Sequence, residues 1–222
     1  MKEKFLKASP LSCLIIMFCT GFSFALPLAG DTVTISNGTI GTTAGGEFLL
    51  DIGNDETDDY ISFCLEYNEH INYSGTYTVG SVADYAHAGG LSGATDEDGE
   101  MRDYLAEATK WVFWNYLQHT DIFSSKSYDD ALANDVQKII WDLEGETSGW
   151  SDSAYTSTLY TDVKEQGDYS ISGGIVKVLN LEQGGVLKQS QLIAEPVPEP
   201  ATMLLFGSGL LGLTFALRRR KK

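Results

Sequence analysis

The stretch Tyr60-Ile-Ser-Phe-Cys-Leu-Glu-Tyr67 alternates apolar and polar side chains over eight positions. Successive side chains of a strand point to opposite faces, so the alternation predicts a strand with two different faces. The apolar face holds Ile61, Phe63 and Leu65, and the mixed face holds Ser62, Cys64 and Glu66. Cys64 therefore lies where a reactive or partnered group can be presented, although free cysteine is also among the residue types most often buried and inert.

Similar short alternating stretches, separated by glycine or asparagine turns, surround this one and predict further strands. They cover residues 31–40, 46–53 and 74–80 before the middle of the chain, and strands return within 168–193. Between them, the apolar spacing changes to the helical period in 102–118 and 129–145. This order predicts an α+β fold, an antiparallel β-sandwich or barrel-like sheet with an inserted pair of helices.

The second predicted helix carries a glutamine beside its apolar stripe. That stripe consists of Leu132, Val136, Ile139 and Leu143, and Gly145 follows as a natural stop. Gln137 lies at the flank of the stripe, so its amide is expected to point at a neighbouring sheet and not into water. The first helix has an equivalent stripe, formed by Leu105, Ala108, Val112 and Tyr116.

Residues 1–25 have the order of a secretory signal: lysines first, then an apolar run, then small residues at a cleavage point. Two of the three cysteines, Cys13 and Cys19, lie inside this segment and are expected to leave with it. The mature body, predicted as one domain over residues 26–195, then keeps Cys64 alone and has no intrachain disulfide available.

The other end, residues 196–222, combines a proline-rich stretch, an apolar run at 201–217 and five basic residues at 218–222. A tail of this kind fits a simple membrane anchor with its basic end in the cytoplasm. The order Val197-Pro-Glu-Pro-Ala-Thr202 followed by the apolar and basic parts resembles the PEP-CTERM sorting tail of bacterial surface proteins. That resemblance implies a sorting motif at Pro198, Glu199 and Pro200 and processing by an exosortase-type protease. It also implies transient membrane anchoring, then a place at the cell surface or in an extracellular polysaccharide matrix.

The chain is strongly acidic, with 31 Asp and Glu residues against 15 Lys and Arg residues. Such a surface excludes nucleic acid and anionic lipid as natural partners of the body. Two acidic stretches offer oxygen ligands for calcium: Asp51, Asp55, Asp58 and Asp59 in one, and Asp96, Asp98 and Glu100 in the other. Neither has the spacing of an EF-hand loop, so we expect solvated loops and no cofactor.

A cysteine thiol and a glutamine amide that meet can condense, with loss of ammonia, into an internal thioester. The pair Phe63-Cys64-Leu65 and Val136-Gln137-Lys138-Ile139-Ile140-Trp141 resembles the thioester domain of bacterial surface adhesins over residues 45–145. In that family the residues at positions 136 and 139 are usually Thr and Ala. The resemblance implies a Cys64–Gln137 thioester that acylates an amine or hydroxyl on a surface or matrix polymer, in a single-use reaction and not as an enzyme.

Two other functions compete with this one. The first is a non-covalent structural or binding protein of the extracellular matrix, in which Cys64 is an inert core residue. The second is a cysteine-dependent hydrolase, which requires a histidine within hydrogen-bond reach of Cys64. Three histidines are available, His70, His87 and His119, and each is expected to be an ordinary surface or loop residue.

Overall fold

The structure is a computed structural model that describes residues 26–42, 45–56, 59–87, 90, 94–147, 158–197, 207 and 209. The predicted signal segment and the Pro198-Glu199-Pro200 motif lie outside the described residues, as does nearly all of the apolar run at 201–217. No helix in the described part of the chain is both long enough and apolar enough to cross a membrane.

A six-stranded antiparallel sheet forms the main body, in the order β3-β2-β1-β4-β8-β9. Its strands are β1 (Thr32–Thr42), β2 (Gly45–Ile52), β3 (Tyr60–Ser62), β4 (Gly75–Ala83), β8 (Gly174–Gln183) and β9 (Val186–Pro196). The last two strands come from the far end of the chain, and β8 pairs directly with β4, so distant parts of the sequence become neighbours. The antiparallel sheet expected from the alternating stretches is confirmed.

The sheet curls until its two edge strands nearly meet. After β3 ends at Ser62, the closing segment, residues 63–65, leaves β2 and turns to β9. The N–H of Leu65 donates to the carbonyl of Ser190 (3.1 Å), and the N–H of Leu192 donates to the carbonyl of Phe63 (2.9 Å). Because these bonds join one edge of the sheet to the other, the sheet is a nearly closed barrel, with Cys64 at the closure.

A second sheet of three short strands corrects two expectations. It consists of β5 (Tyr85–His87), β6 (Thr95–Glu97) and β7 (Glu100–Tyr104), in the order β5-β7-β6. The acidic stretch at 94–100 is thus largely a β-hairpin, turned by Asp98 and Gly99 with φ of 58° and 86°. Residues 102–104, assigned to the first helix by periodicity, pair in β7 instead, because tertiary pairing overrides a weak local preference.

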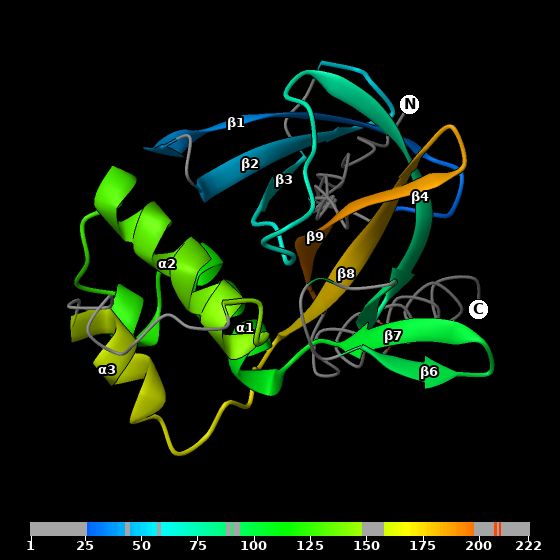
Figure 1. The fold of residues 1–222 in the computed structure, drawn as a ribbon. Helices are drawn as coiled ribbons and strands as arrows, with labels where there is room; N and C mark the ends of the chain where they lie inside the picture. Colours follow the sequence, from blue (N-terminus) through cyan, green and yellow to red (C-terminus); the bar gives the residue numbers. More distant parts are fainter. Residues whose placement is uncertain are drawn as a thin grey trace, which may run out of the picture.

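The helices lie together on one side of the barrel (Figure 1). They are α1 (Glu107–Gln118), the short 3-10 helix η1 (Asp121–Phe123), α2 (Asp130–Leu143) and α3 (Thr158–Lys164). The α1 and α2 helices form the expected inserted pair, and α3 is an addition that the sequence did not predict. The carboxylate of Asp129 caps α2 by accepting the N–H of Leu132 (3.0 Å), and Gly145 follows its end with φ of 75°.

The closing segment separates two apolar cores. Phe63 and Leu65 pack with the helices, in a core that includes the buried aromatic residues of α1. Cys64 packs instead with the inward-facing residues of the barrel strands and with Trp141 from α2. Both faces of this segment are covered, because residues 62–66 are all buried, while Ile61 of the apolar face is 37% exposed.

Candidate functional site

The site is built around an unfinished strand pairing at Cys64. Its two neighbours use their backbone groups to bind β9, so the N–H and the carbonyl of Cys64 point to the other side, where β2 no longer reaches. The amide of Gln137 takes the place of the missing strand. Gln137 Oε1 accepts the Cys64 N–H at 3.2 Å, and Gln137 Nε2 donates to the Cys64 carbonyl at 2.8 Å.

This double contact fixes the glutamine amide against the thiol. The distance from Cys64 Sγ to Gln137 Oε1 is 3.3 Å, and Gln137 has no exposed surface while Cys64 keeps 3%. Gln137 comes from α2, which packs against β1 and β2 beside the closing segment. The structure thus brings together the two residues that the sequence singled out, although 73 positions separate them.

The thiol lies in surroundings that oppose its ionisation. Burial raises the pKa of the Cys64 thiol well above its usual range, and the charge that Glu66 carries once it is ionised raises that pKa further. The indole N–H of Trp141 acts in the opposite direction, since it lies close enough to lower the thiol pKa, although it makes no hydrogen bond of ordinary geometry. Cys64 is consequently a neutral thiol at pH 7, unlike the low-pKa cysteines of hydrolases.

Several carboxyl groups of the domain are buried, and Glu66 is the one nearest to Cys64 in sequence and acts on its thiol. Glu66 is 1% exposed and binds the N–H of Ser190 through Oε2 (2.7 Å), and its Oε1 is buried without a partner among the described residues. Burial, followed by the charge of Glu69, raises the pKa of Glu66 to about 8. Burial likewise raises the pKa of Glu144 to about 7 and that of Asp103 to about 6. Near neutral pH, Glu66 is therefore mostly uncharged.

The 66–74 loop, which follows the closing segment, carries two partly exposed tyrosines. Tyr67 packs edge-on against Trp141 with 4.9 Å between ring centroids, and its N–H donates to Glu146 Oε2 (3.0 Å). Tyr73 stacks on Phe48 at 5.8 Å. Burial raises the pKa of Tyr73, and the charge of an ionised Cys64 would raise it further.

The two departures from the adhesin pattern and the thiol lie in different cores. Val136 and Ile139 are fully buried in the core on the helix side, whereas Cys64 and Trp141 belong to the barrel core. The larger side chains at positions 136 and 139 are therefore accommodated on the helix side of the closing segment.

The histidines lie elsewhere. Nε2 of His87 is 3.1 Å from the hydroxyl of Ser81, and His119 stacks on Tyr128 with ring centroids 3.7 Å apart. His70 is exposed in the 66–74 loop. Since none of them hydrogen-bonds to the thiol in the described structure, the arrangement offers no histidine base for a hydrolase.

The acidic stretches serve the local backbone. Asp51 accepts the N–H groups of Asp55 and Glu56, and Asp59 accepts that of Ile52. In the other stretch, Asp96 accepts the N–H of Gly99 and Glu100 pairs with Arg102. Asp58 lies outside the described residues, and within the described part no group of three metal-binding side chains occurs.

Sequence reasoning missed the partners that β9 supplies. Gln191 forms the bridge to Cys64 and accepts the hydroxyl of Ser62 (3.1 Å), and Gln189 donates to the carbonyls of Glu66 and Glu69 (2.7 Å each). No local pattern marks these residues, since they act on a segment that lies 120 or more positions away. The segment 136–141, which the sequence singled out for Gln137, also contains Trp141, whose indole lies close to the thiol.

The comparisons with known proteins identify the tail. Residues 196–221 match the PEP-CTERM protein-sorting motif. The chain carries a surface-sorting tail. The motif marks an exported protein that is anchored in the membrane, processed there by an exosortase and sorted to the cell surface.

One solved structure is similar to the body of the chain. It is the N-terminal domain of the Streptococcus pyogenes pilus tip adhesin Cpa, at 13% sequence identity and a TM-score of 0.40. The similarity covers 79% of this chain and 98% of that one. The comparison with curated proteins gives no match.

Proposed function

We propose that this protein attaches covalently to a surface or matrix polymer through an internal thioester between Cys64 and Gln137. The observation that carries the proposal is the contact itself: a buried, unpaired thiol whose sulfur lies 3.3 Å from the oxygen of a buried glutamine amide. The sorting tail supports it, because it delivers the domain to the cell surface, where such a polymer is within reach.

The chemistry balances without a cofactor. The sulfur of Cys64 attacks the amide carbon of Gln137, the C–N bond breaks, and the thiol proton leaves with the amide nitrogen as ammonia. An incoming amine or hydroxyl then attacks the same carbon, the C–S bond breaks, residue 137 becomes an amide or ester of the nucleophile, and the proton of the nucleophile passes to the sulfur of Cys64. Each chain reacts once, so the protein is a single-use acylating agent and not an enzyme.

The surroundings suit each step. The two hydrogen bonds to the backbone of Cys64 hold the amide plane fixed against the sulfur, which supplies the proximity that the condensation needs. The Cys64 N–H already points at Gln137 Oε1, the atom on which negative charge develops during both attacks. Burial of Cys64 and Gln137 keeps bulk water from the thioester bond. An incoming nucleophile would approach past the 66–74 loop, which carries the partly exposed Tyr67 and Tyr73.

The alternative is a non-covalent matrix protein with an inert Cys64. One observation favours it: the Gln137 amide satisfies two backbone groups of Cys64, which is by itself a sufficient structural reason for a buried glutamine. The two functions share the fold and the contact, and they differ only in whether ammonia is lost.

The test is the intact mass of the purified full chain, before and after treatment with methylamine. The thioester predicts a mass one ammonia below the calculated value, which rises by one methylamine as a free thiol appears. Cys64→Ala and Gln137→Ala should each abolish both changes, and Gln166→Ala, which alters a glutamine far from Cys64, should abolish neither. The calculated mass without a methylamine adduct, on a fresh sample with a reduced thiol, rules out the covalent function.

A further inference from the structure

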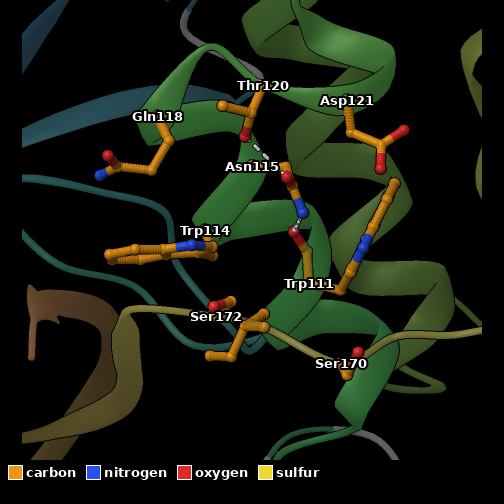
Figure 2. Close-up of a pocket in the computed structure, with 9 residues that line it drawn as sticks. Trp111, Trp114, Asn115, Gln118, Thr120, Asp121, Ser170 and Ser172 are labelled. Carbon is orange, nitrogen blue, oxygen red and sulfur yellow. Dashed lines mark hydrogen bonds between the residues drawn. The ribbon is translucent and has the colours of Figure 1, made fainter. Parts of the chain in front are cut away.

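A cavity lies away from Cys64, between α1, the turn that leads to η1 and the segment that precedes β8. Its volume is about 340 Å³, at the lower end of the range for small-ligand sites. Nine residues line it: Trp111, Trp114, Asn115, Gln118, Thr120, Asp121, Ser170, Ile171 and Ser172. Figure 2 shows the two indoles apart from each other, on opposite sides of the view, with polar side chains around them.

The floor of this pocket is rigid. The indole of Trp114 lies so close to Gly174 that a Cβ on that glycine would be 2.2 Å from the ring. Trp111 packs edge-on against Tyr169, with ring centroids 6.1 Å apart. The side chain of Asn115 links the floor to the rim, because it donates to the carbonyl of Trp111 (2.9 Å) and accepts the hydroxyl of Thr120 (2.7 Å).

The rim of the pocket, in contrast, consists of polar side chains that are available for a ligand. Gln118, Asp121, Ser170 and Ser172 are exposed, and their side chains make no hydrogen bond within the described part of the chain. Asp121 has a φ of 51°, a left-handed backbone that non-glycine residues adopt rarely and mostly at turns or functional positions. This backbone directs its carboxylate to the rim, above Trp111 in the view of Figure 2.

The lining selects one class of ligand. Lysine and arginine are missing from it and its one charged side chain is Asp121, so phosphates and acidic sugars are disfavoured. The polar rim disfavours a purely apolar ligand, which would leave these groups without partners. Trp111 and Trp114 are 3% and 7% exposed, so they offer a ligand narrow apolar edges against which the C–H groups of a sugar ring can pack. Amide, carboxylate and hydroxyl groups of the rim bind the hydroxyls of such a ring. We propose that this pocket binds an uncharged pyranose unit of a saccharide.

The pocket is independent of Cys64 and goes beyond the proposed covalent attachment. At 100° per residue, Trp111, Trp114 and Gln118 share one face of α1. Phe113 and Tyr116 lie on the opposite face, where their rings contact Phe63 in the closing segment at 6.1 and 5.3 Å. The α1 helix therefore stands between the two sites, so saccharide binding needs neither the thiol nor the glutamine that it faces.

Calorimetric titration of the full chain in detergent, with cellobiose, maltose and N,N′-diacetylchitobiose as probes, tests the proposal. At least one of these neutral disaccharides should bind saturably, and glucuronic acid should not bind. The double variant Gln118→Ala, Asp121→Asn should weaken that binding about tenfold, because it removes the Gln118 amide and replaces the charged acceptor of Asp121 by a neutral amide. Asparagine tolerates the left-handed backbone, so this variant keeps the turn. Glu165→Gln and Cys64→Ala are the controls and should bind as the unaltered chain does.

Three results would overturn the proposal. They are no saturable binding of any of the three disaccharides, binding that the double variant leaves unchanged, or binding of glucuronic acid that is as tight as that of the disaccharides. Both altered side chains are exposed, so an unchanged near-ultraviolet circular dichroism spectrum is expected. If the double variant proves unfolded, Ser172→Ala replaces it, with a smaller loss of affinity expected and an unchanged affinity counting against the proposal.

Discussion

Two glutamines on adjacent helices show how different the surroundings of the Cys64 site and of the pocket on α1 are. Gln137 on α2 has no exposed surface, and both ends of its amide bind the backbone of Cys64. Gln118 on α1 is exposed, and its amide has no partner within the described structure. The side-chain amide is thus buried in the sealed region around Cys64, where it suits a bond that water must not reach. In the open region on α1 the amide is exposed, where it suits reversible binding.

The sealed region should respond most strongly to pH, through Glu66. Its pKa is raised to about 8, so the folded state holds the proton while the unfolded chain releases it near pH 4.5. The free energy of unfolding should therefore fall as the pH rises from about 4.5 to 8, by up to roughly 5 kcal/mol, and stay level above that. Urea unfolding of the full chain between pH 5 and 9 measures this change.

Glu66→Gln should make this slope shallower from about pH 4.5 upward and should abolish it between about pH 7 and 8, where Glu66 alone contributes. Glu144 and Asp103 also have raised pKa values, of about 7 and 6, so a slope of the same sign should remain below pH 7. Glu165→Gln is the control, because that carboxylate is exposed. A slope that survives in Glu66→Gln up to pH 8 would show that Glu66 does not hold a proton in the folded chain.

The second prediction separates the structural role of Gln137 from its chemistry. In a Cys64→Ala background, which cannot form a thioester, Gln137→Ala should lower the free energy of unfolding by about 2–4 kcal/mol. The reason is that it leaves a buried N–H and a buried carbonyl at residue 64 without partners. Gln118→Ala in the same background should cost less than about 0.5 kcal/mol. Equal effects of the two changes, measured by urea unfolding, would mean that water replaces the Gln137 amide.

Much of this architecture follows from local sequence, and the site does so in part. Alternation predicted the strands around Cys64, and the N-cap Asp129 with the stop at Gly145 bounds a helix whose flank carries Gln137. The pairing of the two residues depended on a resemblance to a family. Alternation alone assigned Cys64 to a mixed face and left its burial open, because it cannot show that helices cover one side of a strand while the barrel closes over the other.

The features that sequence could not predict depend on distant partners. The bridge from Cys64 to Gln191 joins segments that have no common pattern. Residues 102–104 carry a helical spacing, yet two neighbouring strands hold them in β7. The hairpin turn at residues 98–99 did have a recognisable signal, which the acidic composition of the stretch obscured. The pocket on α1 is completed by residues 170–172, which local order alone does not place beside that helix.

The third prediction alters the open region and leaves the sealed one intact. Gly174→Ala places a Cβ 2.2 Å from the Trp114 ring, so the indole has to move within a packed core. The free energy of unfolding should fall by about 1–3 kcal/mol, as for other overpacked cores. Saccharide binding should be lost, because the displaced Trp114 is part of the pocket floor. The mass change with methylamine should persist, because α1 separates the two sites.

Gly167→Ala, where a Cβ meets no atom within 4 Å, is the matched control and should change neither property. Loss of the methylamine reaction in Gly174→Ala would show instead that the pocket floor and the Cys64–Gln137 contact depend on one packing unit, and that the two regions are not independent.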